Sequence, residues 1–136
     1  RKEIEVLNLK ATEEIKESLK SQVKSFNGYH LVLGLIKLPN SEALKKLSFE
    51  LKNEIDNLVA VLAADIDGKP QLAIVVNELL VKEKGIHAGK MVKELSREIK
   101  GGGGGQPFFA TAGGKDSSGL PIALEKAEML IQQALK

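Results

Sequence analysis

Two adjoining features of this sequence could bind an anionic ligand: a basic segment and the run of glycines that follows it. The stretch from Lys100 to Gly119 holds eight of the chain's 13 glycines, five of them consecutive at Gly101–Gly105. Without a Cβ atom, a glycine amide can approach a phosphate closely and can adopt a positive φ. A flexible linker is the alternative interpretation. Only 17 residues follow Gly119, too few for a second domain, so we favour a binding loop.

Four cations precede the glycines in a stretch, Ile86 to Lys100, whose pattern predicts a helix. Apolar residues at Ala88, Val92, Leu95 and Ile99 mark the buried side. The cations are spaced three, four and three residues apart and would fall on one narrow sector opposite: Lys90, Lys93, Arg97 and Lys100. A solvated face whose charges pair with Glu94 and Glu98 is the alternative. Next to the glycine run, this ridge favours binding to phosphates and ribose.

The motifs of catalysis and metal binding do not fit this sequence. A Walker loop needs Gly-Lys followed by Ser or Thr, whereas Gly105 is followed by Gln106 and Pro107. The chain has no cysteine, and its two histidines, His30 and His87, have no partner at metal-ligand spacing. His87 either has a structural role at a helix start or donates to a phosphate. We therefore predict no catalytic residue, no metal and no cofactor in this chain.

Short segments after the glycine run allow two interpretations each. Phe108 and Phe109 either stack on a base or pack in a core that is otherwise aliphatic, since aromatic residues make up only 4% of the chain. Ser117 and Ser118 either cap the last helix or lead into it. Neither pair decides the function.

The apolar patterns predict an α+β fold, a mixed β-sheet covered by helices. Three continuous apolar runs read as buried strands: His30–Leu38, Leu58–Ala64 and Leu72–Asn77. Asp67–Gly68 makes the last two a hairpin, and the segment "PFFATA" is a possible further strand. Besides the basic stretch, helices are expected after a cap at Ser41, with the stripe Leu44, Leu47, Leu51 and Ile55, at Glu78–Lys84 closed by Gly85, and at Leu120–Lys136.

An amphipathic helical arm is expected to precede this domain, from Lys2 to about Lys24. Its apolar residues form one stripe: Ile4, Leu7, Ala11, Ile15, Leu19 and Val23. Such a stripe needs a partner, and we expect coiled-coil-like pairing with a second copy or with upstream chain; packing on its own domain is the alternative. We divide the chain into an arm, 1–27, and a globular domain, 28–136. Because it opens at Arg1 inside a helical pattern, we expect a fragment of a longer protein.

Composition restricts the class of partner. A net charge of +2 and a pI near 8.8 are too moderate for a domain that depends on phosphate contacts alone, so any nucleic-acid site must be local. The absence of cysteine suits a reducing, cytoplasmic location. Apolar runs of about eight residues are too short to span a bilayer, so no membrane association is predicted.

The segment "GIHAGKMVKELSREIKGGGGGQPFFATAGGKD", Gly85 to Asp116, resembles the DHH-associated domain, and more closely the form found at the C-terminal end of alanyl-tRNA synthetases. The resemblance implies a non-catalytic module that holds the elbow of tRNA, expected to be tRNA-Ala, so that the aminoacylation and editing centres of the missing N-terminal domains act on one tRNA. It also implies a contribution to self-association. The matching positions are the glycine run, His87, Lys90, Gly113 and Gly114, with Lys115 next to them. Gln106 stands where the family often has a basic residue.

The DHH-associated domain also suggests a second function, the substrate-binding half of a DHH-type phosphodiesterase or exonuclease. Those enzymes carry Asp-His-His metal ligands in a separate domain, and this sequence has none. The alanyl-tRNA synthetase form is favoured by the long amphipathic arm and by the close match at the glycines. In either case the chain itself is not expected to be an enzyme, whereas its parent is, with alanine–tRNA ligase preferred.

Overall fold

The computed structural model describes residues 14–26, 28–37, 40–66 and 68–135. After a helical segment at residues 14–21, the elements run in the following order: β1 (Lys24–Phe26), β2 (Tyr29–Lys37), α2 (Ser41–Glu54), β3 (Leu58–Ile66), β4 (Lys69–Val76), α3 (Glu78–Lys84), α4 (Ala88–Leu95), a 3-10 turn (Ser96–Ile99), β5 (Gly102–Gly105), β6 (Phe109–Gly113), a second 3-10 turn (Ser117–Gly119) and α5 (Leu120–Leu135).

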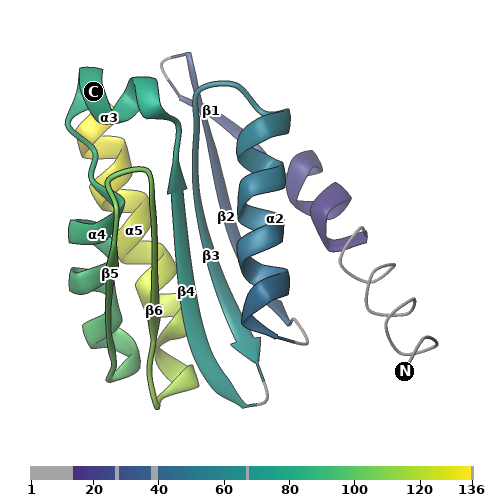
Figure 1. Cartoon of the computed structure of the whole chain (residues 1–136), viewed down its shortest axis with the longest axis vertical. Coiled ribbons are helices and arrows are strands. Elements are labelled where there is room, and N and C mark those ends of the chain that lie inside the picture. Colours follow the sequence, from purple (N-terminus) through teal and green to yellow (C-terminus); the bar gives the residue numbers. More distant parts are fainter. Residues whose placement is uncertain (1–13, 27, 38–39, 67, 136) are drawn as a thin grey trace.

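The strands form one mixed sheet in the order β1-β2-β3-β4-β6-β5 (Figure 1). Only β2 and β3 are parallel, because α2 connects them as a crossover helix; the other neighbours are antiparallel. The expected α+β class, a mixed sheet covered by helices, is confirmed. So is the β3–β4 hairpin, where Gly68 adopts a φ of 77°.

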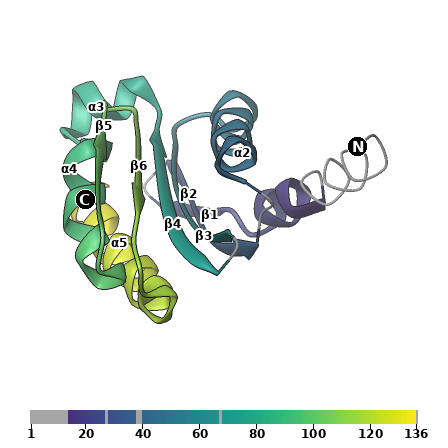
Figure 2. The ribbon, with the colours of Figure 1, turned by 60° about the horizontal axis from the view of Figure 1, so that its bottom comes forward.

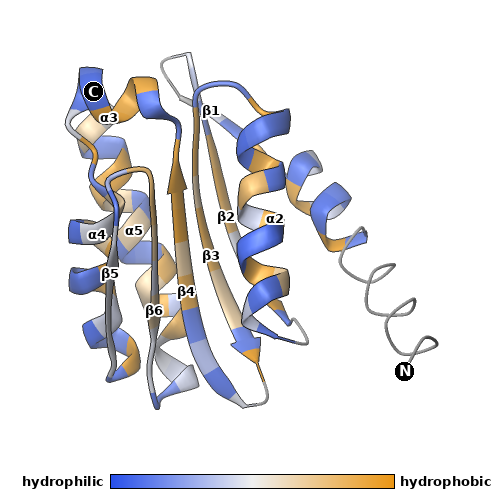
Figure 3. Cartoon of the chain, viewed as in Figure 1, coloured by the Kyte–Doolittle hydropathy of each residue, from blue (hydrophilic) through white to orange (hydrophobic). Residues whose placement is uncertain are grey.

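Helices cover both faces of the sheet (Figure 2), and each face has its own apolar core. One core lies under α4 and α5 and the other under α2 and the segment 14–21. Because β3 and β4 are covered on both sides, their residues are buried almost without alternation, as their continuous apolar runs predicted. Figure 3 shows apolar residues along β3 and the upper part of β4, and hydrophilic residues at the lower end of β4 and on parts of α2 and α4.

Two helix ends show how the local sequence sets the boundaries. The expected cap at Ser41 is wrong: Asn40 is the N-cap of α2, and its side-chain oxygen accepts from the Ala43 N–H at 2.8 Å. Gly85 ends α3 in the left-handed conformation, as predicted, with a φ of 67°. Leu44, Leu47 and Leu51 are buried as expected, whereas Ile55 lies at the C-cap.

The N-terminal helix ends earlier than expected, at residue 21, and Lys24–Phe26 form β1 instead. Within the described part, its stripe packs on its own domain: Leu19 is 3% exposed in the core under α2, and Ile15 packs beside it. Lys20 adds ion pairs to Glu54 and Glu17. Ile4, Leu7 and Ala11 lie outside the described residues, and the division at residue 27 stays a prediction.

The basic helix is also shorter than the predicted span of Ile86 to Lys100. His87 has an extended backbone and is the N-cap of α4. From Ser96 the α-helix is replaced by a 3-10 turn, whose C-cap Lys100 has the left-handed conformation with a φ of 54°. The hydroxyl of Ser96 donates to the Lys93 carbonyl, so it competes with the regular helical pattern at this point. The segment expected to be a glycine loop is a strand, β5.

Candidate nucleic-acid interface

The glycine run forms the outer strand of the sheet, paired only with β6. Its register faces Gly104 with Thr111 and Gly102 with Gly113. The Gln106 N–H donates to the Phe109 carbonyl at the hairpin end. Hydrogen-bonded and non-bonded pairs alternate in an antiparallel ladder, so Gly102 and Gly104 bond to β6. The N–H and C=O groups of Gly103 and Gly105 therefore point away from β6, and the Gly105 carbonyl oxygen lies against Gly89 of α4.

Packing requires glycine at three of the five positions in the run. A Cβ atom at Gly103 would lie 2.3 Å from the Thr111 carbonyl oxygen, and one at Gly101 would lie 1.9 Å from that of Gly113. A Cβ atom at Gly105 would lie 2.6 Å from the Phe109 carbonyl oxygen, so these three positions exclude any side chain. At Gly102 a Cβ atom would meet nothing within 4 Å. The absence of a side chain at Gly102 thus has no internal packing reason, and leaves the backbone accessible from outside.

Helix α4 lies directly against β5 because Gly89 allows a close approach. A Cβ atom at Gly89 would lie 2.8 Å from the Gly105 carbonyl oxygen. The same packing places Lys93 beside the strand, with its Cε atom 3.5 Å from the position of a Cβ atom on Gly104. At least one cation of the predicted ridge therefore lies next to the glycine strand.

The predicted cations are all solvent-exposed, although they do not share one α-helix. Lys90 and Lys93 belong to α4, Arg97 to the 3-10 turn, and Lys100 is its left-handed C-cap. The alternative pairing with Glu94 and Glu98 is not observed: both glutamates lie near Lys126 of α5, at 3.8 and 3.6 Å. Across the described residues, none of the four cations takes part in an ion pair, so their charge is available to a ligand.

His87 has the structural role that one interpretation gave it. Its Nδ1 atom accepts from the Lys90 N–H at 3.2 Å and caps α4. In this arrangement the ring proton sits on Nε2, and the half-buried ring keeps that atom as a donor. Capping and donation to a ligand are therefore compatible.

The segment after β6 returns to the end of the basic helix. The N–H of Lys115 donates to the Ile99 carbonyl at 2.9 Å. A Cβ atom at Gly114 would lie 2.2 Å from that same oxygen, so this glycine is required, whereas one at Gly113 would meet nothing. The Lys115 side chain is exposed. The fold thus brings Gly113 and Lys115 to the region of Lys100 and the start of β5.

Asp116 forms hydrogen bonds in the same region, next to Lys115. Its carboxylate accepts from the hydroxyl and the backbone N–H of Ser118, and so caps the 3-10 turn ahead of α5. These hydrogen bonds, with a smaller contribution from the charge of Lys100, hold the pKa of the Asp116 carboxyl below its usual value. The carboxylate is therefore ionised near Lys100 at neutral pH. Ser117 and Ser118 lie in the lead-in to the last helix.

The two phenylalanines after the glycine run are in contact with the domain. Phe109 packs on Phe49 of α2, with ring centroids 4.7 Å apart, and belongs to the apolar cluster on that face. Phe108 lies under the Lys52 ammonium, 4.9 Å from the ring centroid. The core interpretation therefore holds for Phe109, and the ring of Phe108 already has a cation on it.

A cavity beside β5 was not predicted from the sequence, because its lining comes from four separate segments. It has a volume of about 320 Å³ and opens on the glycine strand at Gly102. Thr111 and Gln71 contribute polar groups, and the Ser41 hydroxyl donates to the Gln71 side-chain oxygen at 3.0 Å. No spacing rule links positions this far apart. The cavity makes the glycine strand accessible at this point.

Features of two other classes of protein are absent from the residues that the structure describes. No group of three or more His, Cys, Asp or Glu residues is placed to hold a metal ion there. Nor does that part of the chain contain a helix long and apolar enough to cross a bilayer.

A glycine edge strand with adjoining cations, on a mixed sheet covered by helices, is the combination of features that characterises this domain. The model of the DHHA1 domain matches residues 27–133, and the chain belongs to this family. The resemblance noted at Gly85 to Asp116 is thereby confirmed.

Curated relatives place this domain in a particular context. The chain is 40% identical over 131 residues to the alanine–tRNA ligase of Cytophaga hutchinsonii and 43% identical over 132 residues to that of Christiangramia forsetii. These matches cover 96% and 97% of the chain but only 15% of each relative. The chain therefore spans about a seventh of the length of these enzymes.

A solved structure shows the same fold. The C-Ala domain from Aquifex aeolicus alanyl-tRNA synthetase matches with a TM-score of 0.69 at 24% identity, over 83% of this chain and 96% of that domain. At this level of identity the likeness concerns the fold. It supports the architecture of the sheet and its helices independently of the sequence matches.

Proposed function

We propose that the chain is the C-terminal, tRNA-binding module of an alanine–tRNA ligase, and that it binds the elbow of tRNA-Ala through the edge formed by β5 and its adjoining cations. The observation that carries the proposal is a solvent-facing strand made only of glycine, beside cations that have no ion pair in the described part of the chain. The identity to ligases from two organisms supports the choice of RNA. The parent's activity and its cytoplasmic location belong to the same proposal.

The mechanism follows from what this edge offers. The outward N–H groups of Gly103 and Gly105 donate to phosphate or ribose oxygens, which approach closely because no Cβ atom intervenes. Lys93 neutralises a phosphate at the same strand, and Lys90, Arg97, Lys100 and Lys115 extend the positive surface. Phosphate and 2′-OH contacts recognise the shape of a folded RNA rather than its sequence. The module supplies part of the affinity and the other domains supply the rest.

The phosphodiesterase alternative has less support. The relatives at 40% and 43% identity are ligases, and no observation on this chain favours cleavage of a substrate. We therefore retain one proposed function for the glycine edge.

The decisive experiment measures tRNA-Ala binding as a function of salt. Replacing Lys93, Arg97 and Lys100 with Ala removes three positive charges beside β5. Affinity should fall at least tenfold, and the slope of log K against log salt should decrease by about 2 to 3, because fewer counterions are released. The matched control replaces Lys45, Lys46 and Lys69, which are exposed on α2 and β4. An equal loss in the control would mean a non-specific effect of net charge and would contradict the proposal.

Recognition of the elbow is tested with the RNA rather than the protein. A minihelix that retains only the acceptor arm lacks the elbow, so it should bind more weakly than the full tRNA, and the triple variant should bind the minihelix about as well as wild type does. Equal binding of both RNAs by the wild-type chain would argue against the elbow.

Self-association is the second part of the proposed function. Ile15 and Leu19 are used within the domain, so association through the arm would depend on Ile4, Leu7 and Ala11. Ile4→Asp with Leu7→Asp should then reduce the sedimentation coefficient at high protein concentration. An unchanged profile would exclude the arm as the interface.

A further inference from the structure

The cavity beside β5 differs from the rest of the proposed interface because its lining carries no charge. Only Gly, Ala, Leu, Ser, Thr and Gln residues line it, whereas the edge of β5 lies beside Lys93. Its volume of about 320 Å³ is at the lower end of the range for ligand sites, roughly 300–1,000 Å³. The cavity therefore suits a small neutral group rather than a phosphate.

Two glycines form the floor of this cavity. Gly102 of β5 faces Gly113 of β6, and Gly113 faces Gln71 of β4, so the three residues lie in one row across the sheet. A Cβ atom at either glycine would meet nothing within 4 Å, so internal packing does not require glycine there. Without side chains, this part of the two strands exposes its peptide planes as a flat surface.

The floor is open to solvent on the face of the sheet that α2 covers elsewhere. α2 packs on β3 and β4, whereas Gly102, Gly113 and Thr111 are exposed. Leu44 of α2 supplies an apolar wall. In the next row of the sheet Thr111 faces Gly104, the glycine beside Lys93. A nucleotide could therefore place its neutral part on the floor and its phosphate near the cations.

Gln71 is placed to recognise a group that enters the cavity. The Ser41 hydroxyl donates to the Gln71 Oε1 atom at 3.0 Å and so fixes the position of the amide. The Nε2 group of Gln71 offers two N–H donors, and it has no partner among the described residues. In the same part of the chain the Thr111 hydroxyl also lacks a partner. A planar group with acceptor atoms on its rim would satisfy both.

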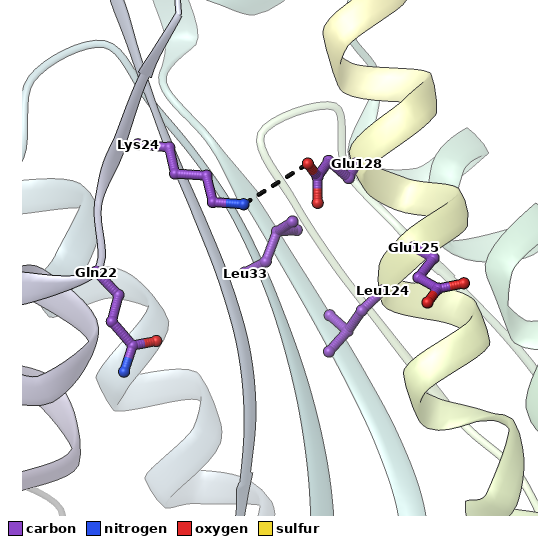
Figure 4. Close-up of a pocket in the computed structure, with 6 residues that line it drawn as sticks. All are labelled: Gln22, Lys24, Leu33, Leu124, Glu125 and Glu128. Atoms are coloured by element: carbon purple, nitrogen blue, oxygen red, sulfur yellow. Dashed lines mark ion pairs between the residues drawn. The ribbon is translucent and has the colours of Figure 1, made fainter.

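The opposite edge of the sheet has a cavity of opposite character. β1 pairs with only the first part of β2, so among the described residues 33–37 have a strand neighbour on one side only. A cavity of about 470 Å³ beside Leu33 is lined by Glu125 and Glu128 against the single cation Lys24 (Figure 4). Figure 4 shows the Glu128 carboxylate directed at Lys24, 3.6 Å away. This acidic excess opposes a polyanion, so the neutral cavity beside β5 suits RNA better.

We propose that the cavity beside β5 binds an unpaired nucleobase, which stacks on Gly102 and Gly113 and presents acceptor atoms to Gln71 and Thr111. This site rests on the proposed function and deepens it, because it assigns the face of the glycine strand to a base and its edge to phosphates. A nucleobase is the flat, neutral part of a nucleotide and carries acceptor atoms on its edge. Proteins recognise unpaired RNA bases by stacking and by hydrogen bonds to those edges. Ribose is also neutral but is not flat, so it would not cover the floor.

The first experiment compares guanosine 5′-monophosphate with ribose 5-phosphate, which has the phosphate and the sugar but no base. Both are titrated into the full chain labelled with ¹⁵N and followed by NMR. The nucleotide should shift the signals of the Gln71 side-chain amide and of the Gly102 and Gly113 backbone amides, and ribose 5-phosphate should leave them unchanged. Both compounds should shift the Gly103 amide at the edge. Equal shifts in the cavity with both compounds would overturn the base site, and no shift at any glycine would contradict the base site and the phosphate edge together.

The second experiment measures tRNA-Ala binding by Gln71→Ala as a function of salt. Affinity should fall by about three- to tenfold, the loss expected for one or two hydrogen bonds. The slope of log K against log salt should stay at its wild-type value, because a neutral contact releases no counterions. Ser41→Ala, which frees the amide, should cause part of the same loss. Gln132→Ala on α5 is the matched control, since Gln132 is also half-buried with one side-chain hydrogen bond.

The salt dependence separates this site from the phosphate edge. Wild-type affinity in Gln71→Ala, together with a reduced slope in the triple variant of Lys93, Arg97 and Lys100, would reject the base site and keep the edge. A reduced slope in Gln71→Ala, or an equal loss in Gln132→Ala, would also contradict the base site.

Gly113→Ala tests the floor without a change at Gln71. The new methyl group has free space in the protein, so the midpoint of unfolding in urea should stay the same. It would nevertheless occupy the surface on which the base stacks, and tRNA affinity should fall at least about fivefold, again with an unchanged salt slope. Normal tRNA binding by a folded Gly113→Ala variant would exclude stacking on this floor.

Discussion

The two edges of the sheet expose similar backbone groups but very different surroundings. At the β2 edge the open strand carries Leu33, Leu35 and Lys37 beside hollows lined by apolar and acidic residues. At the β5 edge the strand has no side chains, and the neighbouring cations extend into solvent. Unpaired N–H and C=O groups alone therefore do not specify a partner. The adjacent side chains do so, and at the β5 edge their positive charge supports the proposed binding of a polyanion.

Each edge also uses glycine in its own way. At Gly34 of β2 a Cβ atom would lie 2.5 Å from the terminal methyl group of Leu19, which is the end of a flexible side chain. At Gly103 of β5 the close atoms belong to the backbone of β6. A side chain can rotate away, whereas a paired strand cannot. The two positions therefore predict substitutions of very different cost.

The largest effect on the free energy of unfolding is expected at the β5 edge. Gly103→Ala should lower the free energy of unfolding by about 2–4 kcal/mol, because the new methyl group overlaps the β6 backbone. Urea denaturation measures this difference. A loss below about 0.5 kcal/mol would mean that β5 does not pair with β6 in the register described here.

The matched control at the same edge is Gly102→Ala. A Cβ atom at this position would meet nothing within 4 Å, so stability should change by less than about 0.5 kcal/mol. Binding of tRNA should nevertheless weaken severalfold, since the methyl group would occupy the approach to the strand. If Gly102→Ala bound tRNA like wild type, this position would not lie in the interface.

A smaller effect on stability is expected at the start of α4, the helix that packs against β5. His87→Ala removes the Nδ1 acceptor of the Lys90 N–H and should cost about 1 kcal/mol of stability. His87→Asn retains a capping oxygen and should recover most of that loss. Measuring tRNA affinity for both variants separates the two roles of this residue. If only capping matters, the asparagine variant should bind normally; equal weakening in both would indicate a direct contact through the imidazole.

The sequence predicted the centre of the fold better than its edges. The buried runs of β2, β3 and β4 were readable because two covered faces require continuous apolar residues, and Gly85 marked the end of α3. β5 could not be predicted, because a run of glycines has no pattern of alternating side chains. It is a strand only because it pairs with β6. β1 was not predicted, because its first residue, Lys24, was assigned to the end of the arm helix and a strand of three residues is too short to show an alternating pattern.

The candidate site was predicted in part. The cations and glycines were identified by type and spacing, and the fold places Lys93 against Gly104 and brings Lys115 near Lys100. The different roles of alternate glycines could not be predicted, because they depend on the register with β6. Neither could the pairing of Glu94 and Glu98 with Lys126, which comes from a helix almost 30 residues farther along. Contacts between distant segments decide both.

The smallest effect on the free energy of unfolding is expected at Gly34, in β2. Gly34→Ala should lower the free energy of unfolding by less than about 1 kcal/mol, because the displaced atom is the end of the Leu19 side chain. The displacement should instead loosen the segment 14–21 from the sheet, since Leu19 is the residue of that segment that is buried in the core under α2. Hydrogen exchange should therefore quicken in residues 14–21 while β3 and β4 stay protected. A global loss of protection equal to that of Gly103→Ala would mean that the two edges are equally rigid, and the contrast between a yielding side chain and a fixed strand would fail.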